Sequence, residues 1–132
     1  MQRGSKLKRV LIQFDEFSLQ ARLNDTPIAE ELWKQLPLES QVNTWGDEIY
    51  FAIPVDMPQE LDAREILVVG EIGYWPVGKS FCIFFGPTPV STDQRPRAFS
   101  PVNILGEVLG NSQGLKAIKD HDKVKLLRSD EG

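Results

Sequence analysis

One segment of the sequence has the spelling of a phosphate-binding loop. Residues 73–80 read GYWPVGKS, which matches the pattern GxxxxGK[ST] at every fixed position. That pattern binds phosphate when a helix follows it, because the backbone amides at the start of the helix then point at the phosphate. Here the following residues, FCIFF, are typical of a strand, and Pro76 has no N–H group to offer. We therefore interpret the match as accidental and expect no cofactor.

Other residues with obvious chemistry are few. His121, the sole histidine, lies in a polar turn, and Cys82, the sole cysteine, lies in the middle of an apolar strand. They are far apart in the sequence, so no metal site of ordinary spacing can be written from them. A Cys–His nucleophile pair remains formally open, although an inert core thiol is the better interpretation of Cys82. Asp47 and Glu48 would face opposite sides of a strand and make a poor acid/base pair.

Aromatic side chains give the strongest remaining signal. Residues 42–54 and 70–89 together contain both tyrosines, two of the three tryptophans and four of the seven phenylalanines. They cannot all fit inside one small β-barrel. One interpretation places most of them in the core and in a belt that caps a hairpin. The other is a concave apolar binding site with a few polar groups, and its predicted residues are Glu48, Tyr50, Tyr74, Trp75, Phe84 and Asn103.

Composition limits the class of protein. A chain of 132 residues is long enough for one domain with a sizeable core. The net charge of -4 argues against binding to nucleic acid, because neutralising phosphates needs a basic surface. The one basic cluster, four residues at the N-terminus, is interpreted as a solvated arm. No apolar run approaches the roughly 18 residues of a membrane span, and the N-terminus lacks the apolar segment of a signal peptide. With one cysteine, we expect a soluble, cytoplasmic protein with no membrane partner.

The pattern of apolar residues and turn signals predicts a mainly β fold. Thr26 and Pro27 have the types expected at the start of a helix, Pro37 ends it, and a second short helix is expected at 111–118. The absence of a βαβ rhythm favours an antiparallel barrel or sandwich. Strands are predicted at residues 10–14, 17–23, 42–45, 48–53, 65–69, 80–85, 102–108 and 123–128.

Two segments without regular structure complete the expected layout. Residues 73–79 are expected to form a turn-rich aromatic loop, and residues 86–101, with four prolines, form the longest irregular stretch. Long loops often carry function, so the second is the favoured functional loop. The predicted boundaries are a flexible N-terminal arm at 1–8, one domain at 9–128 and a frayed tail at 129–132.

Several of these segments resemble the cyclophilins. SFCIFF (80–85), PTP (87–89) and VNILGEV (102–108) follow one another as the corresponding strands and loop do in cyclophilins, and IYFAIP (49–54) is similar to their FHRIIP strand. WGDEIYF (45–51), GYWPVG and FFGPTP resemble more specifically a small prokaryotic family of cyclophilin-like barrels, over residues 9–128. The resemblance implies a closed cyclophilin-like barrel of about eight strands with two short helices.

The resemblance also suggests an activity. Cyclophilins are peptidyl-prolyl isomerases that hold a proline in an apolar pocket, with an arginine near the amide that rotates; no cofactor is needed. In this sequence the arginine position falls on Phe51 and the pocket histidine falls on Val102. Arg95 or Arg97 could replace the arginine from the long loop.

Three functions therefore remain open. The favoured one is a binding domain that accepts a small ligand or an extended peptide in an aromatic cleft. The alternative is a weak peptidyl-prolyl isomerase with a non-standard active site. The third is a homo-oligomer in which exposed aromatic residues of one copy pack against another.

Overall fold

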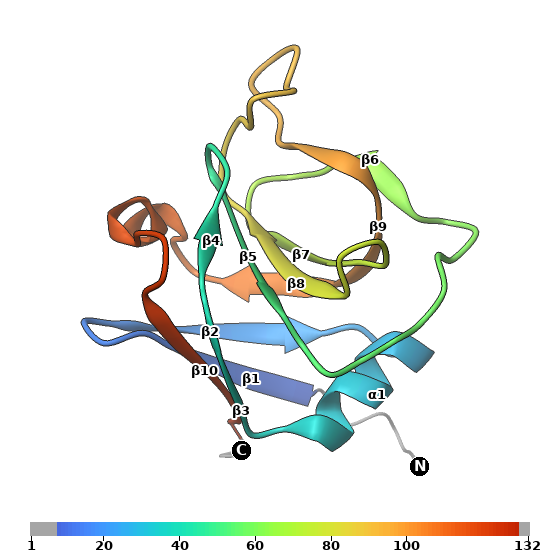
Figure 1. The fold of residues 1–132 in the computed structure, drawn as a ribbon, viewed down its shortest axis with the longest axis vertical. Helices are drawn as coiled ribbons and strands as arrows, with labels where there is room; N and C mark the ends of the chain where they lie inside the picture. Colours follow the sequence, from blue (N-terminus) through green and yellow to red (C-terminus); the bar gives the residue numbers. More distant parts are fainter. Residues whose placement is uncertain (1–7, 130–132) are drawn as a thin grey trace.

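The computed structural model describes residues 8–129, which form ten strands, one α-helix and one 3-10 helix. Their order can be followed by colour in Figure 1. The elements are β1 (Lys8–Gln13), β2 (Ser18–Leu23), α1 (Pro27–Gln35), β3 (Leu38–Gln41), β4 (Asn43–Thr44), β5 (Glu48–Ala52), β6 (Arg64–Ile66), β7 (Glu71–Trp75), β8 (Ser80–Phe84), β9 (Arg97–Leu109), η1 (Gln113–Ala117) and β10 (Lys123–Arg128).

One antiparallel sheet wraps around the core without closing. The hydrogen-bonded order is β3-β10-β1-β2-β9-β7-β8-β5-β4, and β6 pairs with β9 beside this path. The two edge strands, β3 and β4, are successive parts of one extended segment and are separated only by Val42. Successive parts of one segment cannot lie side by side, so no ladder joins the edges. The predicted closed barrel of about eight strands is therefore wrong in closure and in strand number.

The differences in strand number have local causes. Residues 71–75 form β7, although residues 73–79 were expected to be a loop, and β3 begins directly after the Pro37 that ends the helix. Strand β9 has 13 residues and begins inside the predicted loop 86–101, so the irregular part is shorter. Strand β6 ends at Ile66, because Val68 and Val69 lie in an exposed turn. The second predicted helix is the short 3-10 helix η1.

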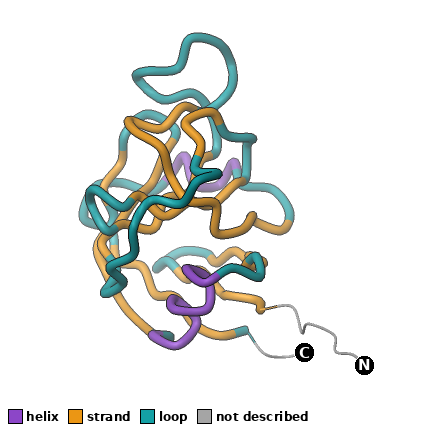
Figure 2. The backbone as a smooth tube through the Cα atoms, turned by 90° about the vertical axis from the view of Figure 1, so that its right-hand side faces the viewer, coloured by secondary structure: helices purple, strands orange, loops and turns teal. Residues whose placement is uncertain are grey.

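The N-terminal hairpin and the helix agree with the sequence prediction. Strands β1 and β2 pair in antiparallel register, and β10 occupies the predicted residues 123–128. Helix α1 begins at Pro27, and the Thr26 hydroxyl oxygen accepts a hydrogen bond from the backbone N–H of Ala29 at 3.3 Å. In Figures 1 and 2, α1 lies at one end of the molecule and the loop of residues 86–96 protrudes at the other.

Apolar side chains form a main core and a smaller second cluster. Strand β8 is buried along its whole length and separates the two. Phe81 and Ile83 belong to the main core. The other face of β8 contributes to the second cluster. That cluster consists of Leu67, Cys82, Phe84, Ala98 and Val102, with Tyr50, Trp75 and Ile104 packed against it.

The ends of the chain limit two of the predictions. Residues 1–7 and 130–132, in which most of the predicted arm and tail fall, lie outside the described residues. Lys8, assigned to the arm, already belongs to β1. Within the described part of the chain, no helix has the length and apolar character needed to cross a membrane.

The close approach of β9 to β2 gives a test of the fold. A side chain at Gly106 would overlap the backbone carbonyl oxygen of Arg22, which neighbouring ladders hold in place. We expect Gly106→Ala to lower the free energy of unfolding by about 3 kcal/mol, measured by urea denaturation. Gly114→Ala is the matched control, because its added carbon would meet Phe17 at an ordinary 3.5 Å. Equal stability of the two variants would contradict the tight β2–β9 contact.

Candidate functional site

A cleft of about 230 Å³ lies next to the second cluster. Strand β5 supplies Glu48 and Tyr50, β7 ends in Trp75, and the first half of β9 supplies Ala98, Phe99 and Val102. Trp45 comes from the turn between β4 and β5. These strands meet because β8 pairs with both β5 and β7, and β7 pairs with β9. The residues that line the cleft are Trp45, Glu48, Tyr50, Trp75, Ala98, Phe99 and Val102.

Four aromatic rings form a continuous wall of the cleft. Tyr50 and Trp75 meet edge to face with ring centroids 6.2 Å apart, and Trp75 meets Phe99 in the same way at 6.2 Å. Phe99 in turn meets Trp45 at 6.1 Å. The interplanar angles are between 75° and 82°, so successive rings present their faces in different directions. Such edge-to-face pairs are favourable, and they hold the wall in shape.

Trp75 is fixed by contacts outside the cleft. Its indole N–H donates a hydrogen bond to the Ser100 hydroxyl at 2.7 Å, so the polar atom of the ring is already satisfied. Gly78, in the turn after β7, lies directly against the indole, and any side chain there would overlap the ring. The ring can therefore offer its apolar surface to a ligand without leaving a polar group unpaired.

Glu48 places an acid in this apolar environment. The residue is only 6% exposed, yet it lines the cleft. Its carboxyl makes no ion pair within residues 8–129, and the buried Cys82 thiol lies against it. Burial raises the pKa of Glu48 to about 7, since an apolar environment disfavours the ionised form. Burial likewise raises the pKa of the Cys82 thiol well above its ordinary value, so this cysteine is a poor nucleophile.

The structure brings together half of the predicted site residues. Glu48, Tyr50 and Trp75 line the cleft. Tyr74 does not line the cleft, because its side chain lies on the opposite face of β7 from Trp75. It is fully buried in the main core, and its hydroxyl donates to the Val55 carbonyl at 2.6 Å.

Phe84 and Asn103 are also fully buried and are absent from the cleft wall. Phe84 packs inside the second cluster. The Asn103 side chain holds the loop before β6, since its amide group donates to the Pro58 carbonyl at 3.0 Å and its oxygen accepts from the Glu60 N–H at 2.8 Å. Asn103 therefore supports the fold through hydrogen bonds with this loop.

Four residues of the cleft were absent from the predicted site: Trp45, Ala98, Phe99 and Val102. Trp45 belonged to the aromatic set found in the sequence, and Val102 occupied the position of the cyclophilin pocket histidine. Both were available signals. Phe99 and Ala98 lay in a segment expected to be loop, so their faces could not be assigned.

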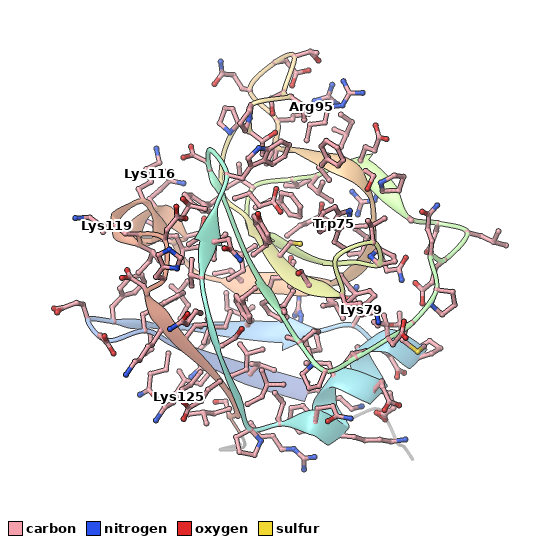
Figure 3. All side chains as sticks on the ribbon, in the orientation of Figure 1. Trp75, Lys79, Arg95, Lys116, Lys119 and Lys125 are labelled. Carbon is pink, nitrogen blue, oxygen red and sulfur yellow. The ribbon has the colours of Figure 1, made fainter. Side chains whose placement is uncertain are left out.

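Within residues 8–129, no arginine lines the cleft in place of the cyclophilin arginine. Phe51, at its position, is fully buried in the main core and stacks on Phe81 with ring centroids 5.0 Å apart. Arg97 pairs with Glu65 at 3.3 Å. Arg95 pairs with an aspartate on its own loop, and Figure 3 shows it on the protruding loop, away from Trp75. Neither arginine lines the cleft.

The phosphate-loop spelling forms no phosphate site, although its Trp75 lines the cleft, and His121 is absent from the cleft wall. Residues 73–80 form the end of β7, a tight turn and the start of β8, so a strand follows where a phosphate loop needs a helix. Lys79 pairs with Asp56 at 3.4 Å. His121 lies in a turn and its backbone N–H donates to the Val42 carbonyl. Among residues 8–129 no group of three or more acidic, histidine or cysteine side chains could hold a metal ion.

A family model and a solved structure match this chain over nearly its whole length. The family described as "Cyclophilin-like" matches residues 8–127. The solution structure of a hypothetical protein from Archaeoglobus fulgidus is similar, with a TM-score of 0.83 and 32% sequence identity. The match covers 98% of this chain and 100% of the archaeal chain. No curated protein matches the sequence.

The buried acid gives a pH test. Glu48 in the unfolded chain ionises above its ordinary pKa of 4.5, whereas the folded protein keeps the proton until about pH 7. Stability from the neutral form is therefore complete below pH 4.5 and is lost as the pH rises to 7. We compare the free energy of unfolding of Glu48→Gln with that of the native protein at each pH. From pH 4 to pH 8 we expect this difference to shift by about 3 kcal/mol in favour of the variant.

Urea denaturation from pH 4 to pH 8 measures the difference in unfolding free energy between the variant and the native protein. Any effect of the amide that does not depend on pH cancels when the differences at two pH values are compared. Glu39→Gln removes the same charge from an exposed side chain that is paired with Lys125. Its stability relative to the native protein should change little with pH. If Glu48→Gln gives a curve parallel to that of the native protein, Glu48 does not titrate as a buried acid.

Proposed function

The chain belongs to the cyclophilin-like family, and we propose that it is a binding domain whose aromatic cleft accepts a small ligand or an extended peptide. The observation that carries the proposal is the uncovered aromatic wall. Phe99 alone is 69% exposed, and Trp45, Tyr50 and Trp75 are each only partly buried. Large apolar faces gathered in a concave site with a few polar groups are typical of ligand pockets.

The support of the cleft favours a preformed site. Two of its walls lie on β5 and β9, which are held by ladders to their neighbours. The loop before β9 is also held, since the Thr88 hydroxyl donates to the Arg97 carbonyl at 2.6 Å and its N–H donates to the Ser91 hydroxyl at 2.9 Å. A ligand would therefore lose little binding energy to ordering the site.

Prolyl isomerisation is the less favoured function. The aromatic cleft could hold a prolyl ring, but catalysis also needs a donor near the rotating amide. The cleft residues include no arginine, and the polar side chains on its wall are Glu48 and Tyr50, with the indole N–H of Trp75 bonded to Ser100. No observation in residues 8–129 favours a relocated donor.

The three tryptophans provide a test of ligand binding. Trp45 and Trp75 line the cleft, whereas Trp33 lies under Arg128, whose guanidinium carbon is 4.8 Å from its ring centroid. In a screen of small apolar fragments by two-dimensional NMR, we expect hits to shift the indole N–H signals of Trp45 and Trp75. The Trp33 signal should stay in place, because its ring belongs to a different surface.

Two variants separate the cleft from general apolar binding. Phe99→Ala should remove the hits and leave the fold intact, because Phe99 is largely exposed. Val77→Ala is the matched control, since Val77 is 76% exposed and does not line the cleft. Hits that survive Phe99→Ala would refute the cleft as the site. If the protein sediments as a dimer and the fragments no longer bind because Phe99 is covered, the homo-oligomer is favoured instead.

A protease-coupled assay with a proline-containing peptide tests the isomerase function. We expect no rate above the uncatalysed background, because the cleft has no arginine beside the position of the amide. A true cyclophilin at the same concentration is the positive control. Acceleration by this protein that disappears in Phe99→Ala would contradict the expectation and assign isomerase activity to the cleft.

A further inference from the structure

We propose that the ligand of this cleft is a small organic cation bearing a methylated ammonium group, held against the aromatic wall and paired with Glu48. The inference rests on the proposed function, because it names the chemical class of the ligand for the same cleft. Three properties of the cleft carry it: the sign of its charge, the arrangement of its rings and the scarcity of its hydrogen-bonding groups.

The charge of the cleft is set by one residue. Among the described residues that line it, only Glu48 is acidic and none is basic. The nearby cations are engaged elsewhere, since Arg97 pairs with Glu65 and Lys116 lies 4.0 Å from Asp47. An anionic ligand would meet an acid with no counter-charge. A cation supplies the partner that the carboxyl lacks, and a buried charge is tolerated when it is paired.

The aromatic wall is suited to a cation as well as to apolar groups. The face of an aromatic ring attracts a cation within about 6 Å of its centroid, and tryptophan does so most strongly. The cleft has two tryptophans, Trp45 and Trp75, with Tyr50 and Phe99 set between or beside them at steep angles. Rings at such angles can surround a rounded group, and trimethylammonium has that shape.

The few hydrogen-bonding groups favour a methylated ammonium over a primary one. A primary ammonium has three N–H donors that need acceptors. The side chains on the wall that could accept are the Glu48 carboxylate and the Tyr50 hydroxyl, and the rest of the lining is aromatic or aliphatic. A quaternary ammonium has no donor to leave unpaired, and its methyl groups match the apolar wall.

Ionisation of Glu48 couples cation binding to pH. Because the pKa of Glu48 is raised, its carboxyl is protonated in much of the ligand-free protein at neutral pH. A bound cation favours the carboxylate, so affinity should rise as the pH increases through 7. The titratable groups that face Glu48 are the Cys82 thiol of β8, which stays protonated because its pKa is raised, and the phenol of Tyr50 on β5.

Calorimetric titration with two probes of similar shape tests the proposal. Choline carries a trimethylammonium group, and 3,3-dimethylbutan-1-ol replaces its nitrogen with carbon and is neutral. At pH 8 we expect choline to bind at least about tenfold more tightly than the alcohol, a factor that corresponds to 1.4 kcal/mol. Glu48→Gln should remove this preference, whereas Glu39→Gln, which changes the net charge equally at an exposed position, should keep it.

The outcomes separate this inference from the proposed function. If the alcohol binds as tightly as choline, or if Glu48→Gln leaves choline binding unchanged, the proposal of a cation paired with Glu48 is refuted. The proposed function then stands, because a compound still binds in the cleft. A short peptide with trimethyllysine tests the cation as a side chain, and binding of either cationic probe through Glu48 supports the inference. If neither binds while neutral fragments still shift Trp45 and Trp75, the inference fails alone. If no compound shifts these signals, the proposed function fails as well.

Discussion

Strand β8 lies between two apolar layers, with Phe81 and Ile83 facing the main core and Cys82 and Phe84 facing the second cluster. Burial on both faces requires cover on both sides: the main core covers one face, and Leu67, Ala98 and Val102 cover the other. The flanking strands β5 and β7 join β8 edge to edge through continuous ladders. Their register then determines which side chains reach the second cluster. Glu48, opposite Phe84 across one of these ladders, is placed in the cleft by this arrangement.

The carboxyl of Glu48 is a cost that the fold itself does not require. It lies opposite an apolar residue, makes no ion pair in residues 8–129 and carries a desolvation penalty. Proteins retain such unfavourable groups chiefly where function needs them. The thiol of Cys82 has a different status, because a small buried cysteine packs as an apolar residue would.

Periodicity predicted much of the fold but only part of the site. Strand β5 follows the alternation of its sequence, since Ile49 and Phe51 lie in the main core while Glu48 and Tyr50 line the cleft on the other face. In β7 the same rule was available: Tyr74 and Trp75 are adjacent, so in a strand they cannot line one cleft. Proline and glycine near them suggested a loop and concealed the alternation. Closure of the sheet and the path of β9 depend on long-range pairing, which local patterns do not specify.

Gly78 illustrates how the size of a cleft can be determined from outside it. This residue makes no part of the cleft wall, yet its missing side chain is the space that the indole of Trp75 occupies. Replacement by any other residue would have to displace that ring, and one wall of the cleft would move with it. A change at Gly78 alone would therefore alter the width of the cleft while every residue that lines it stays the same.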